Sequence, residues 1–164
     1  MAQPTGFLIM GVSGSGKTSV GKALAQKLGW DFFDADDFHP AENIAKMTAG
    51  IPLDDSDRAP WLAALHQVLS ATLKSNHHPI LACSALKHKY RVQLLEGLAG
   101  LEIIYLKENY DLIWSRMSAR EGHYMKPEML KSQLAALEEP VDAFVLDISL
   151  SLNDMIDKIL ARYF

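Results

Sequence analysis

Residues 11–18 of the chain read Gly-Val-Ser-Gly-Ser-Gly-Lys-Thr and match the pattern G-x-x-x-x-G-K-[ST] at every fixed position. The glycines allow backbone conformations that side chains would obstruct, so that amide N–H groups can converge on phosphate oxygens. The lysine adds positive charge, and the threonine hydroxyl is a ligand for Mg²⁺. This segment, called the phosphate loop below, therefore predicts binding of a nucleotide. The contacts are expected from Gly11, Ser13, Gly14, Ser15, Gly16, Lys17, Thr18 and Ser19.

The flanking sequence supplies the strand and the helix that such a loop requires. Residues 7–10 read Phe-Leu-Ile-Met, a continuous apolar run typical of a buried parallel strand. After the loop, Val20, Leu24 and Leu28 recur at helical spacing, and Gly29 ends the helix. The alternative is a glycine-rich loop that binds nothing, and this context disfavours it.

Apolar runs alternate with helical patterns along the rest of the chain. The further candidate strands are residues 32–34, 80–83, 103–106 and 144–148. This alternation predicts an α/β protein with a parallel sheet. The long stretch at about 39–78 is expected to hold two helices, inserted over the carboxyl edge of the sheet, where ligands bind. At 164 residues, the chain is expected to form a single domain, 1–164.

The composition of the chain limits which binding partners and which cellular compartment we expect. The formal net charge of −4 disfavours a nucleic acid as partner, because a phosphate backbone calls for a basic face. Cys83 is the only cysteine, so no disulfide can form within the chain, which suits a reducing compartment. No apolar run approaches the roughly 20 residues of a membrane span, and no signal peptide is recognised. We expect a cytoplasmic protein without a membrane partner.

Two carboxylates follow the second candidate strand. Asp34 and Asp36 are two residues apart and are expected near the phosphate loop. One of them can hold Mg²⁺ through water, while the other orients or deprotonates an attacking hydroxyl. The sequence leaves open which is the base, and a simple strand-end turn is the alternative. The third candidate strand ends in Cys83-Ser84, where many nucleotide hydrolases carry an acid, so the metal is assigned to Thr18 and the aspartate pair.

Basic residues recur at places that are expected near the loop. Arg116 and Arg120 are four residues apart, hence on one helix face, and they begin a predicted lid at about 116–127. They can stabilise charge during phosphoryl transfer, or they can belong to a solvated helix face. Arg58 either pairs with the acids before it or faces an acidic substrate. The histidines show no zinc spacing, and Trp30, Trp61 and Trp114 are interpreted as packing residues.

A series of longer blocks then matches one family. They include residues 36–40 (Asp-Asp-Phe-His-Pro), 52–62 (Pro-Leu-Asp-Asp-Ser-Asp-Arg-Ala-Pro-Trp-Leu), 83–87 (Cys-Ser-Ala-Leu-Lys) and 134–138 (Leu-Ala-Ala-Leu-Glu). With the phosphate loop and residues 43–47, 90–91, 104–107, 116–120 and 122–125, they span nearly the whole chain in order. The chain resembles the bacterial gluconate kinases, in the shikimate-kinase-like group of P-loop kinases. Tyr124 is a mild departure, because the family usually has phenylalanine there.

The resemblance implies ATP-dependent phosphorylation of D-gluconate at its 6-hydroxyl, with Mg²⁺. It also implies a three-layer α/β/α fold related to nucleoside monophosphate kinases, with a parallel sheet of about five strands, a lid and often a homodimer. In this mechanism Thr18 and Asp34 hold the metal, Asp36 accepts the proton, and Lys17, Arg116 and Arg120 stabilise the transferring group. The residues expected at the substrate are Asp36, His39, Lys46, Arg58, Lys87, Arg91 and His123.

Two other functions compete with this interpretation. One is another small-molecule kinase of the same fold, with shikimate or a nucleotide as acceptor. The other is a nucleotide-binding module that transfers no phosphate, and the Cys83-Ser84 strand end disfavours it. The identity of the acceptor separates these possibilities.

Overall fold

The computed structural model describes residues 2–118 and 127–164. Within them, five parallel strands form one sheet in the order β2-β3-β1-β4-β5. The strands are β1 (Gly6–Met10), β2 (Asp31–Asp34), β3 (Pro79–Ala82), β4 (Leu101–Lys107) and β5 (Ala143–Asp147). Each overlaps one of the predicted apolar runs, with ends that differ by at most two residues. The predicted α/β fold with a parallel sheet of about five strands is confirmed.

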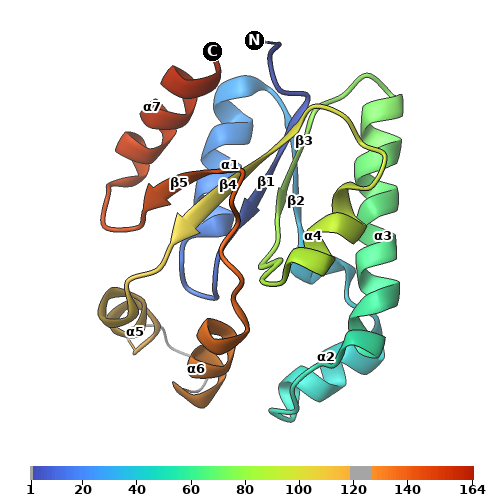
Figure 1. Cartoon of the computed structure of the whole chain (residues 1–164), viewed down its shortest axis with the longest axis vertical. Coiled ribbons are helices and arrows are strands. Elements are labelled where there is room, and N and C mark those ends of the chain that lie inside the picture. Colours follow the sequence, from blue (N-terminus) through green and yellow to red (C-terminus); the bar gives the residue numbers. More distant parts are fainter. Residues whose placement is uncertain (1, 119–126) are drawn as a thin grey trace.

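Helices cover both faces of this sheet (Figure 1). Helices α1 and α7 lie over one face, and α3 and α4 lie over the other, which gives the three layers. The helical segments are α1 (Lys17–Leu28), a 3₁₀ turn η1 (Ala35–Phe38), α2 (Ala41–Thr48), α3 (Asp55–Lys74), α4 (His88–Leu95), α5 (Tyr110–Ser118), α6 (Pro127–Ala136) and α7 (Leu152–Tyr163). The stretch between β2 and β3 thus contains α2 and α3.

The central strand β1 explains why its sequence is apolar at every position. All five of its residues are buried. Phe7 and Ile9 pack into the cluster with α1 and α7, whereas Leu8 and Met10 pack into the cluster with α3 and α4. A strand that is covered by helices on both faces cannot alternate between polar and apolar residues.

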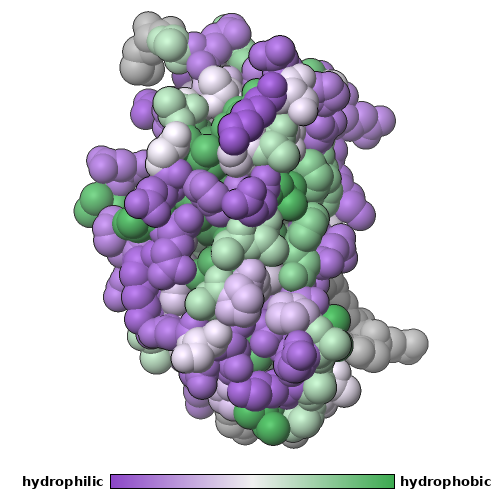
Figure 2. Space-filling view, turned by 90° about the vertical axis from the view of Figure 1, so that its right-hand side faces the viewer, coloured by the Kyte–Doolittle hydropathy of each residue, from purple (hydrophilic) through white to green (hydrophobic). Residues whose placement is uncertain are grey.

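The surface on the α3 side carries many hydrophilic side chains with smaller apolar areas between them (Figure 2).

The sequence also predicted a lid and the lack of a membrane-spanning segment. The predicted lid, about 116–127, lies largely outside the described residues, and α5 and α6 flank it. In the part of the chain that the structure describes, no helix combines the length and the apolar character needed to cross a bilayer.

Helix α3 brings Arg58 and Trp61 to the carboxyl edge of the sheet, and its start is fixed by a capping box. The Asp54 carboxylate accepts a hydrogen bond from the Asp57 amide at 2.8 Å, and the Asp57 carboxylate accepts one from the Asp54 amide at 3.0 Å. These two bonds satisfy amides that have no partner inside the helix.

Replacing Asp54 with alanine should therefore destabilise the protein. The substitution Asp54→Ala removes the cap acceptor, and the free energy of unfolding should fall by about 1 kcal/mol, as measured by urea denaturation. Asp54→Asn keeps an acceptor oxygen and is the matched control, with a clearly smaller loss. Equal losses for the two variants would contradict the capping role.

Candidate active site

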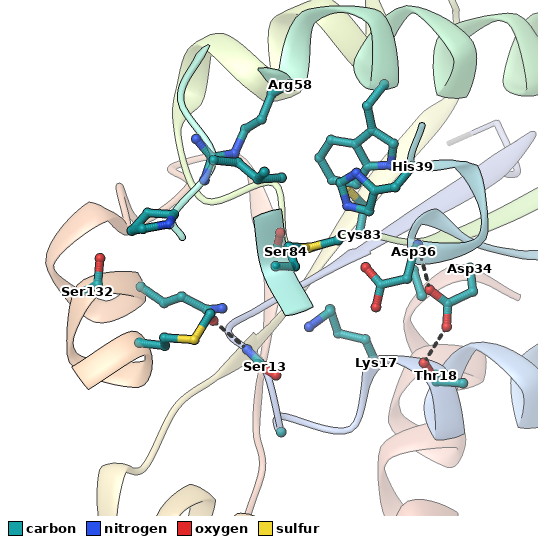
Figure 3. Close-up of a pocket in the computed structure, with 18 of the residues that line it drawn as sticks. Ser13, Lys17, Thr18, Asp34, Asp36, His39, Arg58, Cys83, Ser84 and Ser132 are labelled. Carbon is teal, nitrogen blue, oxygen red and sulfur yellow. Dashed lines mark hydrogen bonds between the residues drawn. The ribbon is translucent and has the colours of Figure 1, made fainter. Parts of the chain in front are cut away.

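A cavity of about 460 Å³ lies at the carboxyl edge of the sheet. Its walls come from the phosphate loop, η1, the start of α3, the end of β3 and α6 (Figure 3). Lys17 and Asp36 point into the same space, and Arg58, His39 and Ser132 stand around it. Segments that are far apart in the sequence therefore meet at one site, as expected for an open parallel sheet.

The phosphate loop is held tightly against the sheet. A Cβ atom at Gly11 would lie 2.7 Å from the Ser15 hydroxyl oxygen and 2.9 Å from the Leu106 carbonyl oxygen, so only glycine fits there. Gly16 has a φ of +100° and leads directly into α1, which begins at Lys17. The first amides of α1 have no partner inside the helix, and the positive end of the helix dipole lies with them. The loop is therefore built to receive an anion.

Not every part of the loop is free for a phosphate. The Ser15 side chain is buried, and its amide donates to the Val12 carbonyl oxygen at 3.2 Å. The Lys17 ammonium donates to the carbonyl oxygens of Gly11 and Val12, both at 3.0 Å. Desolvation lowers the pKa of Lys17, and the nearby Asp36 carboxylate opposes this shift. Lys17 thus lies across the loop with its charge beside the cavity.

The two aspartates after β2 have different surroundings. Asp34 uses one carboxylate oxygen to accept from the Thr18 hydroxyl at 2.9 Å and the other to accept from the Asp36 amide at 3.0 Å. The Asp36 carboxylate instead points into the cavity (Figure 3). Desolvation, together with the Asp34 charge, raises the pKa of Asp36, and Lys17 opposes this. The geometry gives Asp34 the place beside Thr18 and leaves Asp36 facing the cavity.

The residues at this corner fit Mg²⁺ only together with a nucleotide. The Thr18 hydroxyl and the Asp34 carboxylate are oxygen donors of the kind that Mg²⁺ prefers, and they touch each other. Among the described residues, no cluster of three or more histidine, cysteine, aspartate or glutamate side chains could hold a metal alone. The remaining ligands would be phosphate oxygens and water, which is how Mg²⁺ usually binds in kinases.

The wall opposite the phosphate loop combines a cation with a stacked pair of rings. The imidazole of His39 stacks on the indole of Trp61, with ring centres 4.1 Å apart and planes inclined by 14°. The indole N–H donates to the Ala35 carbonyl oxygen at 2.7 Å. Arg58 donates to the Tyr90 hydroxyl at 3.1 Å and also lines the cavity. Trp61, which was interpreted as a packing residue, is buried and forms part of this wall as well.

Helix α6 forms a third wall that the sequence reasoning missed. The side-chain oxygen of Gln133 accepts from the amide of Ser13 in the phosphate loop at 2.8 Å. Met129 and Ser132 line the cavity beside it. The signal that was available is the spacing of Met129, Ser132 and Gln133, which places one methionine and two polar side chains on one helix face.

Arg91, expected at the substrate, does not line the cavity. Its guanidinium donates to the carbonyl oxygens of Ala85 at 2.7 Å, Leu86 at 3.1 Å and Glu138 at 2.8 Å. The residue is buried, and desolvation lowers its pKa. These bonds hold the turn after β3, where Ala85 has a φ of +44°, against the segment that follows α6. The structure thus gives Arg91 a place in the framework behind the cavity.

Several other expected residues also have partners elsewhere. Lys46 pairs with Asp57 at 2.9 Å, Lys87 lies 5.9 Å from the centre of the Tyr90 ring, and Arg116 donates to the Ile148 carbonyl oxygen at 3.0 Å. None of these three lines the cavity. Arg120 and His123 lie outside the described residues. The structure therefore brings together the phosphate loop, Asp34, Asp36, His39 and Arg58.

Comparison with known proteins identifies the family. The shikimate kinase family model matches residues 13–162, and with this loop and sheet it defines the protein as a P-loop kinase of small molecules. The chain is 46% identical to a probable gluconokinase of Mus musculus over 157 residues (85% of each chain) and 44% identical to the thermoresistant gluconokinase of Escherichia coli over 154 residues (92% and 88%). A gluconokinase structure from Sinorhizobium meliloti superimposes with a TM-score of 0.87 at 41% identity, covering 98% of this chain and 92% of that one. The chain belongs to the gluconokinase family, which confirms the resemblance drawn from its motifs.

The framework role of Arg91 leads to a stability prediction. In Arg91→Lys, a single ammonium cannot reach all three carbonyl groups, so the free energy of unfolding should fall by about 2 kcal/mol. Chemical denaturation measures this loss. Gln93→Lys, on the exposed side of the same helix, is the control and should change stability little. Unchanged stability of Arg91→Lys with a strongly raised KM for the acceptor would instead return Arg91 to the substrate site.

Proposed function

We propose that this protein transfers the γ-phosphoryl group of ATP to the 6-hydroxyl of D-gluconate, giving 6-phospho-D-gluconate and ADP. The observation that carries the proposal is one cavity that joins the phosphate loop to a carboxylate, Asp36, and to a cation, Arg58. The phosphate loop can bind a phosphate donor, the carboxylate can orient a hydroxyl nucleophile, and the cation can bind an acidic substrate. The names of the relatives, gluconokinases at 44–46% identity, support the same acceptor.

The nucleotide side of the reaction uses the phosphate loop. The amides at the start of α1 and the Lys17 ammonium bind the ATP phosphates and stabilise charge that develops during transfer. Thr18 directly, and Asp34 through water, would hold Mg²⁺, which when bound neutralises charge on the phosphates. The contact between Thr18 and Asp34 supports this assignment.

Asp36 is the proposed base. Both oxygens of Asp34 already accept hydrogen bonds, whereas the Asp36 carboxylate faces the cavity. A sugar hydroxyl is a weak acid, so Asp36 mainly orients it and takes up its proton only late in the transfer.

Arg58 is the proposed partner of the substrate carboxylate, with His39 beside it. Lys46, Lys87 and Arg91 lie away from the cavity, so this proposal assigns them no direct contact. Charge stabilisation by Arg116 and Arg120, a contact from His123, a closing lid, a homodimer and a cytoplasmic location stay predictions from the sequence.

The acceptor assignment is tested by ADP release from ATP and Mg²⁺ with D-gluconate, compared with shikimate, glucose, nucleoside monophosphates and no acceptor. Of these acceptors, we expect only gluconate to support fast ADP release. In Lys17→Ala, kcat should fall by at least about 100-fold, because the variant loses a charge that stabilises the transferring group. Turnover with shikimate or a nucleotide would indicate another small-molecule kinase. Nucleotide binding without any phosphorylated acceptor would indicate a binding module.

Asp36→Asn separates the base from the metal site. This variant keeps the shape of the side chain but cannot accept a proton, so kcat should fall by roughly 10²–10⁴-fold while the Kd for ATP changes little. Steady-state kinetics and nucleotide titration measure the two effects. Asp37→Asn, the same change on the neighbouring residue, is the control. A parallel loss of ATP affinity would assign Asp36 to the metal.

A further inference from the structure

A buried side chain outside the cavity contacts one that lines it. Asn43 on α2 is buried, with 2% of its surface exposed, and is not part of the cavity wall. Its side-chain nitrogen lies 3.0 Å from the Asp57 carbonyl oxygen and 3.2 Å from Nδ1 of His39. The same nitrogen thus connects the backbone of α3 with the imidazole that faces the proposed substrate.

The protonation pattern of His39 follows from these two contacts. A carbonyl oxygen can only accept a hydrogen bond, so the atom of Asn43 that faces Asp57 must be the NH₂ nitrogen. An NH₂ nitrogen can only donate, so Nδ1 of His39 must be the acceptor and carries no proton. A neutral imidazole has one N–H, and in this arrangement it lies at Nε2.

The surroundings of His39 agree with a neutral ring. Desolvation, with the charge of Arg58, lowers the pKa of His39 to about 4, so the ring is uncharged at pH 7. One face of the ring is covered by the indole of Trp61. Within residues 2–118 and 127–164, Nε2 has no hydrogen-bond partner, and His39 lines the cavity on the same side as Asp36 (Figure 3). The free N–H is thus the polar group that this ring offers to a ligand.

We propose that Asn43 is a positioning residue that holds His39 as its Nε2–H tautomer, so that His39 donates a hydrogen bond to an oxygen of the acceptor substrate. The last step rests on the proposed function, because it takes the ligand to be a polyol acid with hydroxyl and carboxylate oxygens. A neutral donor selects for such oxygens and adds no positive charge beside Arg58. A reversed imidazole, protonated at Nδ1, has no Nε2–H, so the substrate oxygen would lose its donor. An imidazolium would keep that donor but would add a positive charge beside Arg58.

The tautomer is measured directly on the intact wild-type protein. Long-range ¹H–¹⁵N NMR spectra of the ¹⁵N-histidine-labelled protein at pH 7 distinguish the two neutral tautomers and the imidazolium, and the signal that His39→Gln lacks identifies His39. We expect a protonated Nε2 and an unprotonated Nδ1. A protonated Nδ1, alone or with Nε2, would overturn the proposal without any need for an Asn43 variant.

The function of the tautomer is tested with Asn43→Asp. A carboxylate accepts from Nδ1–H, so Nδ1 of His39 should become protonated, and in the resulting reversed tautomer Nε2 no longer donates. The KM for gluconate should then rise by roughly 10-fold, while the KM for ATP stays within about twofold. Asn153→Asp makes the same change on the exposed side of α7 and should leave both values unchanged. A merely structural Asn43 would lower stability without changing the His39 spectrum, and an Nδ1 that stays unprotonated in Asn43→Asp would overturn the positioning role.

The result separates this inference from the proposed function. An Nε2–H tautomer in a protein that does not phosphorylate gluconate would leave the Asn43–His39 arrangement standing, and only the acceptor would be wrong. Rapid gluconate turnover with an Nδ1–H tautomer would contradict the inference and leave the proposed function intact. If Asn43→Asp does not fold, the wild-type spectrum still decides whether the tautomer is the one proposed.

Discussion

The close approach of the phosphate loop to the sheet is the constraint on which the rest of the site depends. At Gly11 the backbone passes so near the Leu106 carbonyl and the Ser15 side chain that no Cβ fits. This contact sets where β1 ends and where α1 begins, and so it aims the first amides of α1 at the space above the sheet. Thr18 can then reach Asp34 after β2, and Ser13 can reach Gln133 on α6. Two segments, the end of β2 and helix α6, are thus bonded to the phosphate loop.

Beside the phosphate loop, different hydrogen bonds give the two aspartates Asp34 and Asp36 different surroundings. Asp34 and Asp36 have the same side chain and lie two residues apart. Each carboxylate oxygen of Asp34 accepts one hydrogen bond, from Thr18 or from the Asp36 amide, while the Asp36 carboxylate faces the cavity. A carboxylate with all its oxygens engaged is fixed in place, which suits a residue beside a metal. One that is desolvated and near a like charge binds a proton more readily, which suits a base. Environment, not residue type, separates the two.

Local patterns explain what the sequence could predict and what it could not. The strands and the phosphate loop were predictable, because apolar runs and glycine spacing act over a few residues. Arg91 and Lys46 were placed at the substrate because of their charge, but their partners are carbonyl groups at residues 85, 86 and 138 and the Asp57 carboxylate, which only the tertiary fold brings near. Helical periodicity likewise indicates that Trp61 is buried, but it does not tell which buried residue borders a cavity.

The balance of charge in the cavity explains why its substrate wall combines a cation with a neutral ring. A polyol acid brings one negative charge and several hydroxyl groups, whereas a nucleotide brings several negative charges. In the proposed function Arg58 would meet the single charge, and a neutral His39 would add a donor without raising the positive potential of that wall. A second cation there would attract the phosphates toward the wrong side of the cavity. On this proposal, an uncharged His39 would help each substrate to bind at its own wall of the cavity.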